Sequence, residues 1–161
     1  MLLYRVHLRG DISIGMYNAE VACDFFETWG RHPTPSSDSR LRTAWSDICD
    51  RNRDTGGRPQ WWFGFGSLAQ FSNWVYHAEW WQKLTDEGYV ISMIEVPEDR
   101  YHLGYTQAIM HKHHCEIVQS VPVIEWETLR QAVQPRDTRR EYYVAMQRYA
   151  EQDAICPAQL S

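Results

Sequence analysis

Short stretches in which apolar residues cluster or alternate with polar ones are typical of strands with a buried face. Five stretches are expected to form strands: residues 2–8, 60–65, 89–96, 101–110 and 115–124. In the first of them, Arg5 falls on the opposite face from Tyr4 and Val6. This strand is therefore predicted to carry a charged side chain on one face and a hydrophobic surface on the other.

Helical spacing of apolar residues predicts the remaining regular structure. Helices are expected at residues 18–29, 41–50, 67–87, 126–133 and 137–151, separated from the strands by loops at residues 10–17, 30–39 and 51–59. In the helix over residues 67–87 one face is apolar, and Ser67 and Gln70 have the spacing of a capping box. Gly88 is well placed to end this helix.

The order of these elements predicts an α+β fold, in which a largely antiparallel sheet is flanked by helices. A length of 161 residues fits one compact domain with its own hydrophobic core. No internal repeat or boundary divides the chain. We therefore expect a single domain over residues 1–161, with its core in residues 1–124 and a C-terminal helical extension over residues 125–161.

Charge and composition exclude several classes of function. The net charge is −5 and no block of five like charges occurs, so direct binding to nucleic acid is not expected. No apolar run reaches 18 residues, so no membrane span is expected. The N-terminus has no secretory signal, and the four cysteines are widely scattered, which favours free thiols and a cytoplasmic location.

The junction between the strand at residues 60–65 and the following helix is the most distinctive part of the chain. Five of the eight tryptophans lie between residues 61 and 81. Ser67 at this junction has two interpretations. As an N-cap it stabilises the helix by about 1 kcal/mol, and the spacing to Gln70 favours this role. As a site residue it stands beside free backbone N–H groups, which can hold a ribose or a phosphate.

A cluster of histidines and a cysteine raises the possibility of a metal site. His111, His113 and Cys115 carry ligands that suit zinc, and the first two share a face of a strand. A closed site requires further ligands, and no spaced partner pair is present. A polar turn between two strands explains the cluster, so no metal is expected.

Two polar residues within apolar strands require an explanation, because a buried polar group must find a partner or a solvent-filled cleft. They are Arg5 in the first strand and Gln107 in the strand at residues 101–110. No nucleophile elbow and no Walker loop occurs, and Gly64 and Gly66 supply only half of a dinucleotide fingerprint.

Three anchors, Tyr4-Arg5, Gly66-Ser67 and Gln107, follow one another in an order that resembles ADP-ribosyltransferase-like proteins. In that layout, a strand with an aromatic residue and Arg, a Ser-bearing strand and a Glu- or Gln-bearing strand frame a nicotinamide cleft. The chain also resembles small phage and prophage proteins of mostly unassigned function over residues 4 to about 124. The stretches that carry this second resemblance are Tyr4–Val6, Gly15–Tyr17, His32–Asp38, Phe63–Phe71 and Gly104–Gln107.

The resemblance implies NAD as cofactor, with Arg5 on its phosphate or ribose, Ser67 on the nicotinamide ribose, and Tyr17 and His32 as further binding residues. It places Gln107, together with Arg5, at the catalytic position. Many such transferases carry Glu there, and Gln cannot supply its charge. Two hypotheses follow: a phage protein that binds NAD or ADP-ribose and modifies a host target, and a non-catalytic anti-defence module that blocks a host protein complex.

Overall fold

A computed structural model describes residues 1–22, 33–55 and 60–132 of the protein, and in it two antiparallel sheets meet at the first strand. The four-stranded sheet has the order β2 (Asp11–Gly15), β1 (Leu2–Leu8), β4 (Tyr89–Glu95) and β7 (Glu116–Pro122). The three-stranded sheet has the order β3 (Trp61–Gly64), β6 (Ala108–His111) and β5 (Tyr101–Leu103). The expected α+β class with antiparallel sheets is confirmed.

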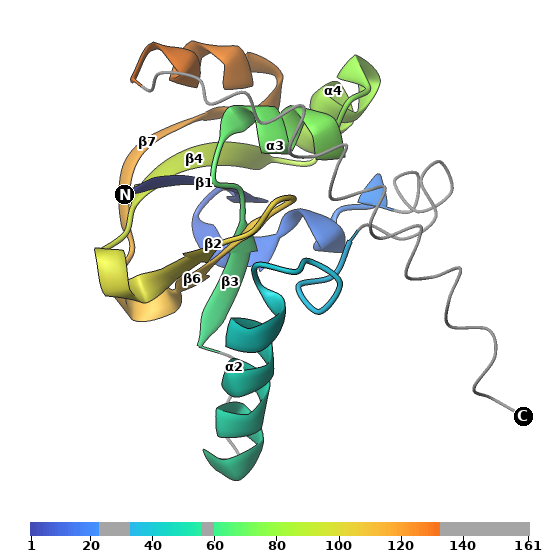
Figure 1. Ribbon diagram of the computed structural model, residues 1–161. Coiled ribbons are helices and arrows are strands. Elements are labelled where there is room, and N and C mark those ends of the chain that lie inside the picture. The colour runs from blue at the N-terminus through green and yellow to red at the C-terminus, as the bar shows by residue number, and fades with distance from the viewer. Residues whose placement is uncertain (23–32, 56–59, 133–161) are drawn as a thin grey trace, which may run out of the picture.

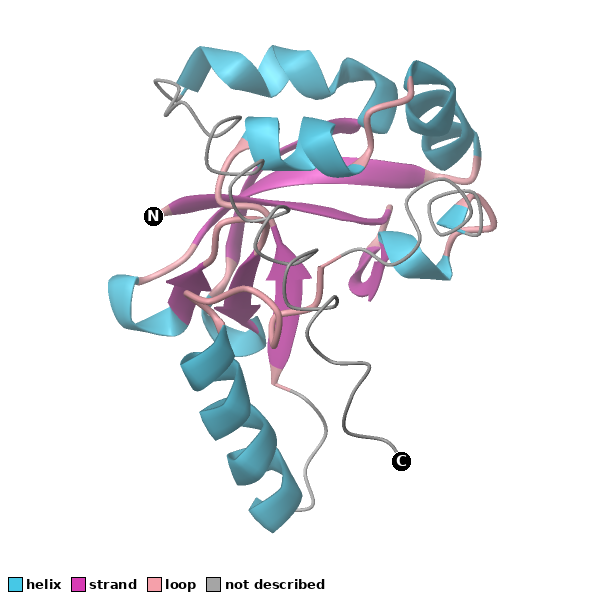
Figure 2. Cartoon of the chain, turned by 45° about the vertical axis from the view of Figure 1, so that its right-hand side comes forward, coloured by secondary structure: helices cyan, strands magenta, loops and turns pink. Residues whose placement is uncertain are grey.

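Helices form layers outside both sheets. The elements α3 (Leu68–Trp74), α4 (Ala78–Asp86) and η4 (Val123–Ala132) lie over the four-stranded sheet, whereas α2 (Arg42–Thr55) lies beside the three-stranded sheet (Figure 1). Figure 2 shows the same helices as an outer layer around the strands. The strands therefore occupy the middle of the molecule (Figures 1 and 2).

The alternation along β1 places its apolar side chains in two separate hydrophobic clusters. Tyr4 and Val6 pack under the helices, in a cluster that also contains Phe71, Trp74, Trp80, Trp126, Ile91 and Met93. Leu3 packs on the other side, with Ile94 of β4 and with Ala108 and Met110 of β6. Arg5 shares the second face, as the sequence pattern predicts, and this face is turned toward the three-stranded sheet.

Two elements differ from expectation near the start and the middle of the chain. Residues 10–17 were expected to be a loop, but β2 forms there because Ile12 packs against the cluster around Leu3 and β1 offers a free edge. The helix expected over residues 67–87 is two helices, α3 and α4. Val75 leaves helical geometry (φ −117°, ψ 73°), and its carbonyl oxygen accepts a hydrogen bond from the Trp81 indole.

The prediction of one strand over residues 101–110 is wrong, and the difference affects the site. It is a hairpin of β5 and β6, closed by a hydrogen bond of 2.8 Å from the Gly104 N–H to the Gln107 carbonyl oxygen. The turn packs tightly against the loop that precedes α2, because a Cβ added to Gly104 would overlap the Asp38 carboxylate and Leu41. Gln107 therefore lies in a turn and not in the middle of a strand.

Other boundaries agree more closely with expectation. Gly88 ends α4 with a positive φ of 86°, as its position after the helical pattern predicts. The helix α2 extends to Thr55, five residues beyond the expected end at residue 50. The short 3₁₀ turns are η1 (Met16–Asn18), η2 (Glu98–Arg100) and η3 (Lys112–His114). Most of the helix expected at 18–29, all of that at 137–151, and His32 lie outside the described residues.

Candidate functional site

The two sheets diverge from β1, and the side chain of Arg5 joins them across the gap. Tyr4 and Phe65 are linked by a pair of backbone hydrogen bonds of 2.8 and 2.7 Å, whereas the other end of β1 pairs with β2 at His7 and Leu8. Arg5 lies between these two points of β1. It donates from Nε to the Ile12 carbonyl oxygen (3.0 Å) and from Nη2 to the Ser13 carbonyl oxygen (3.3 Å). Its Nη1 donates to the carbonyl oxygen of Phe63 on β3.

The guanidinium of Arg5 is a buried cation, and the part of the chain that the structure describes offers it no carboxylate partner. Only 6% of the residue is exposed, and burial lowers the pKa of Arg5 to about 10, so it stays protonated at neutral pH. No carboxylate in the described part of the chain lies within ion-pair distance of it. The guanidinium carbon instead lies 5.1 Å from the centre of the Trp62 ring. A buried positive charge in this state favours an anion beside it.

A cavity of about 360 Å³ opens between β2 and β3, next to Arg5. Its walls hold a second cation, Lys112, and no Asp or Glu of the described residues. Aromatic side chains make up much of the remaining wall, namely Tyr17, Trp61, Trp62, Phe63, Phe65 and Trp74. This acidic protein therefore gathers two positive charges and several aromatic rings around one cavity.

A second cavity of about 470 Å³ adjoins the first. The two share Tyr17, Phe63, Trp74 and Gln107, and we call them together the cleft. The second cavity is walled by the segment Pro33–Ser36 and by Trp45 of α2, and no charged residue lines it within the described ranges. The cleft thus has a cationic half and an uncharged half.

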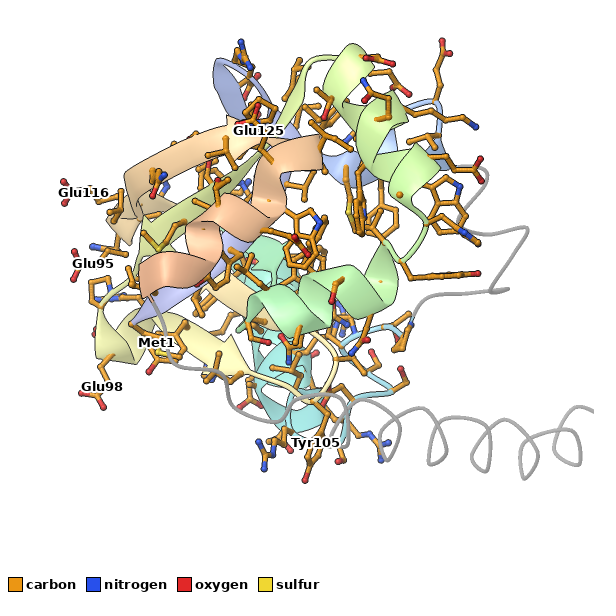
Figure 3. The ribbon with its side chains drawn as sticks, turned by 90° about the horizontal axis from the view of Figure 1, so that it is seen from above. Met1, Glu95, Glu98, Tyr105, Glu116 and Glu125 are labelled. Carbon is orange, nitrogen blue, oxygen red and sulfur yellow. The ribbon has the colours of Figure 1, made fainter. Side chains whose placement is uncertain are left out.

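Carboxylates gather elsewhere on the molecule. Figure 3 shows Glu95, Glu98 and Glu116 at one edge, on a different side from Tyr105, which belongs to the turn beside Gln107. Glu95 and Glu116 pair directly across β4 and β7. The charge of the cleft is therefore locally opposite to the net charge of the chain.

Tyr17 and Gln107, both expected at the site, line the cleft together with Arg5. Tyr17 remains 39% exposed and contacts the edge of Trp74, with ring centres 6.3 Å apart. Burial of its phenol raises the pKa of Tyr17, so the hydroxyl is neutral at physiological pH. Gln107 is 3% exposed, and its Nε2 donates to the carbonyl oxygen of Pro33 at 2.8 Å.

The predictions for Ser67 and His32, the other two residues expected at the site, have different outcomes. Ser67 is the N-cap of α3, where its Oγ accepts from the Gln70 backbone N–H at 3.1 Å, and it lines neither cavity. The capping interpretation is confirmed. His32 lies outside the described residues, although the adjacent segment Pro33–Ser36 does wall the second cavity.

Several residues of the cleft were not singled out from the sequence. Lys112 follows β6 within the histidine-rich turn, and Trp45 belongs to the helix that was expected at 41–50. Asp38 lines neither cavity but is buried nearby (3% exposed), and its Oδ2 accepts from the backbone N–H and the hydroxyl of Thr106 at 3.0 and 3.1 Å. In the sequence, the one signal for this contact between Asp38 and Thr106 was a single acidic residue in a loop of prolines and serines.

The histidine cluster forms a polar turn. Nε2 of His113 lies 2.5 Å from Gln60 Oε1, and Cys115 donates from Sγ to the His111 carbonyl oxygen at 2.9 Å. Burial raises the pKa of the Cys115 thiol and lowers that of His111. Among residues 1–22, 33–55 and 60–132, no group of three or more His, Cys, Asp or Glu side chains has an arrangement that could hold a metal ion.

Comparison with known proteins identifies the family. The sequence profile of the family described as Bacteriophage T4 Y00F protein matches residues 1–124, which is more than three quarters of the chain. The chain belongs to this family. The matched region includes both sheets and every residue of the cleft, so the cleft of this Y00F-family protein lies entirely within the shared part. No curated protein and no solved structure was found to match the chain.

The family match agrees with the expectation of a small phage protein of unassigned function. In the ranges of the chain that the structure describes, no helix has both the length and the apolar character needed to cross a bilayer.

Proposed function

We propose that this Y00F-family protein binds an adenine dinucleotide, NAD or its ADP-ribose part, in the cleft between the two sheets. The observation that carries the proposal is the buried Arg5 guanidinium, which has no carboxylate partner among the described residues and lines a cavity with Lys112. A diphosphate supplies the missing anion, since charge-assisted hydrogen bonds from Arg and Lys to phosphate are strong.

The shape and lining of the cleft support the same ligand class. The two cavities adjoin, so one elongated ligand can place its phosphates in the cationic half and a flat ring in the uncharged half. Aromatic walls such as Phe63 and Trp45 favour a planar heterocycle. The resemblance of Tyr4-Arg5 to the first strand of ADP-ribosyltransferase-like proteins is a further reason for choosing NAD.

We infer further that the nucleotide is held and not transferred. A developing oxocarbenium ion needs a negative charge for its stabilisation, and no Asp or Glu within the described residues lines either cavity. This favours the second hypothesis, a non-catalytic module. The bacteriophage name of the family supports a host protein complex as the target of such a module.

Calorimetric titration tests the binding of NAD and ADP-ribose. We expect both ligands to bind the native chain, and Lys112→Ala to weaken binding about tenfold, because one charge-assisted contact to phosphate contributes about 1.5 kcal/mol. Arg9→Ala is the matched control, since Arg9 is exposed and lies outside the cleft. Absence of heat with both ligands, in a protein shown to be folded, overturns the proposal.

The absence of transfer chemistry is tested separately. NAD is incubated with the protein, and free nicotinamide is measured by chromatography. We expect no nicotinamide above the level of the buffer control. Release that Lys112→Ala reduces would show that the cleft cleaves the glycosidic bond, and the binding-module proposal would be wrong.

A further inference from the structure

Gln107 holds the segment that walls the second cavity. Its side-chain Nε2 lies 2.8 Å from the Pro33 carbonyl oxygen, 74 residues away in the sequence. A carbonyl oxygen only accepts hydrogen bonds, so the amide nitrogen, not the amide oxygen, must face Pro33. This contact therefore fixes the orientation of the Gln107 side chain.

The other atom of the same amide is available to a ligand. Once Nε2 is bound to Pro33, Oε1 is directed about 120° away from it by the planar geometry of the amide. No donor in the described part of the chain bonds to Oε1, and Gln107 lines both cavities. Oε1 is thus a hydrogen-bond acceptor at the junction of the two halves of the cleft.

We propose that Gln107 determines the specificity of the cleft: its Nε2 positions the segment Pro33–Ser36, and its Oε1 selects a ligand that presents an N–H donor to the junction of the two cavities. This inference rests on the proposed function for the identity of the ligand, an adenine dinucleotide. The positioning part stands on the Pro33 contact alone. Gln107 is in this view not a replacement for a lost catalytic acid.

A glutamate at the same position cannot do both tasks. An ionised carboxylate only accepts hydrogen bonds, so it would place a negative oxygen against the carbonyl oxygen of Pro33. A buried acceptor that faces another acceptor has no hydrogen bond and is therefore destabilising. The segment Pro33–Ser36 would then separate from the turn, and the wall of the second cavity would be lost.

A second contact between the loop and the turn, made by Asp38, limits this separation to the segment Pro33–Ser36. Asp38 bonds to the backbone and side chain of Thr106, which lies next to Gln107 in the same turn. It also accepts from the backbone N–H of Arg40 at 3.0 Å. The loop before α2 therefore stays attached to the turn when residue 107 is changed, and variants at this position are expected to fold.

The first experiment compares three dinucleotides by calorimetry: NAD, its analogue with a carboxylate in place of the carboxamide, and its analogue with hypoxanthine in place of adenine. Each analogue lacks one amino group of NAD, which carries two N–H donors, and the hypoxanthine analogue gains an N–H at ring position N1. We expect the native protein to bind one analogue at least tenfold more weakly than NAD, and Gln107→Met to remove that difference. Equal affinity of the native protein for all three, or an unchanged difference in Gln107→Met, overturns the specificity.

The second experiment needs no ligand. Hydrogen exchange is measured at the amides of Ser37 and Asp38, whose N–H groups bond to the Thr34 carbonyl oxygen within this loop. We expect Gln107→Glu to exchange faster than the native chain at pH 7.5. The ratio of the two rates should fall toward one as the pH is lowered to 5, because burial against a carbonyl oxygen raises the pKa of the introduced carboxyl group, and its protonated form can donate to Pro33.

The exposed Gln119→Glu is the matched control and should exchange at the native rate at both pH values. Native-like exchange of Gln107→Glu at pH 7.5 overturns the positioning role. If no dinucleotide binds but Gln107→Glu loses protection, the proposed function and the ligand selectivity are both wrong, and the positioning role of Gln107 stands.

Discussion

The Nη1 group of Arg5 on β1 donates a hydrogen bond to the carbonyl oxygen of Phe63 on β3, and this contact connects side chain and backbone across the gap between two sheets. The same guanidinium bonds to Ile12 and Ser13 on β2. One side chain thus sets the distance between the two strands that border the first cavity. Architecture and candidate binding site depend on the same residue.

Replacement of Arg5 by alanine is expected to destabilise the protein. Three backbone carbonyl groups, those of Ile12, Ser13 and Phe63, would lose a partly buried hydrogen bond from a charged donor, and each such bond contributes about 1 kcal/mol or more. Urea unfolding should show a loss of about 3 kcal/mol. Arg9→Ala, at an exposed position, should change the free energy of unfolding by less than about 0.5 kcal/mol. Equal effects of the two changes would contradict the joining role of Arg5.

Alanine at Gly64 tests the point where the sheets meet. A Cβ at this position would overlap the carbonyl oxygen of Tyr4, and backbone cannot move aside as a side chain can. We expect a loss of about 2 kcal/mol or more in the free energy of unfolding. Gly10→Ala provides the comparison. No atom lies within 4 Å of its added Cβ, and its positive φ of 85° costs about 1 kcal/mol. A Gly64→Ala protein as stable as native would show that the junction is looser than described.

Ser67→Ala separates capping from ligand binding. Ser67 accepts a hydrogen bond from the Gln70 backbone and lines neither cavity. We therefore expect a loss of about 1 kcal/mol in the free energy of unfolding, with unchanged affinity for NAD or ADP-ribose. Thermal unfolding and calorimetry on the same sample measure both quantities. A tenfold loss of affinity at unchanged stability would restore the role in ribose binding that the resemblance implies.

The stability of the protein should depend on the protonation of His7. This side chain is 3% exposed, and its Nε2 lies 2.7 Å from Ser92 Oγ, which in turn lies 2.6 Å from Ser120 Oγ. Burial, the largest cause, and the nearby charge of Arg5 lower the pKa of His7 below its usual value of 6.5. The unfolded chain consequently binds a proton near pH 6.5, whereas the folded chain binds it only at lower pH.

Stability is therefore complete above pH 6.5 and decreases as the pH falls toward the folded-state pKa of His7. Between pH 7.5 and 5.5, we expect the free energy of unfolding to fall more in the native chain than in His7→Gln, which has no proton to bind there. Urea unfolding of both proteins at the two pH values gives the difference. Parallel losses in the two proteins would assign the effect to other groups, such as His102 and His111, whose pKa values are also lowered.

The strands at residues 2–8 and 89–96 could be predicted because the apolar residues within each stretch are enough to indicate a strand. The hairpin at Gly104–Gln107 could not, since the apolar pattern continues through the turn. Only the packing of Gly104 against Asp38 shows why the chain reverses there. The division between α3 and α4 was missed for a related reason. Helical spacing continues across Val75, and a tertiary contact from Trp81 stabilises the interruption.

The cleft was predictable in part. Arg5 and Gln107 were selected because a polar residue in an apolar strand needs a partner, and both line the cleft. Their partners are backbone carbonyl groups of Ile12, Ser13, Phe63 and Pro33, which leave no signal in a sequence. Lys112 was missed for another reason, because that turn was considered only as a possible metal site of its histidines and cysteine, and was then interpreted as a polar turn.

The position of β1 also has a consequence for the order of folding. Its residues pair with β4 from Leu2 opposite Glu95 to Leu8 opposite Tyr89, so its partners lie more than 80 residues further along the chain. Contacts of such long sequence separation form slowly, because a large loop must close first. During synthesis, the first strand must wait until residue 95 has emerged before it can take its central place. The cleft that depends on this strand is then among the last parts of the molecule to assemble.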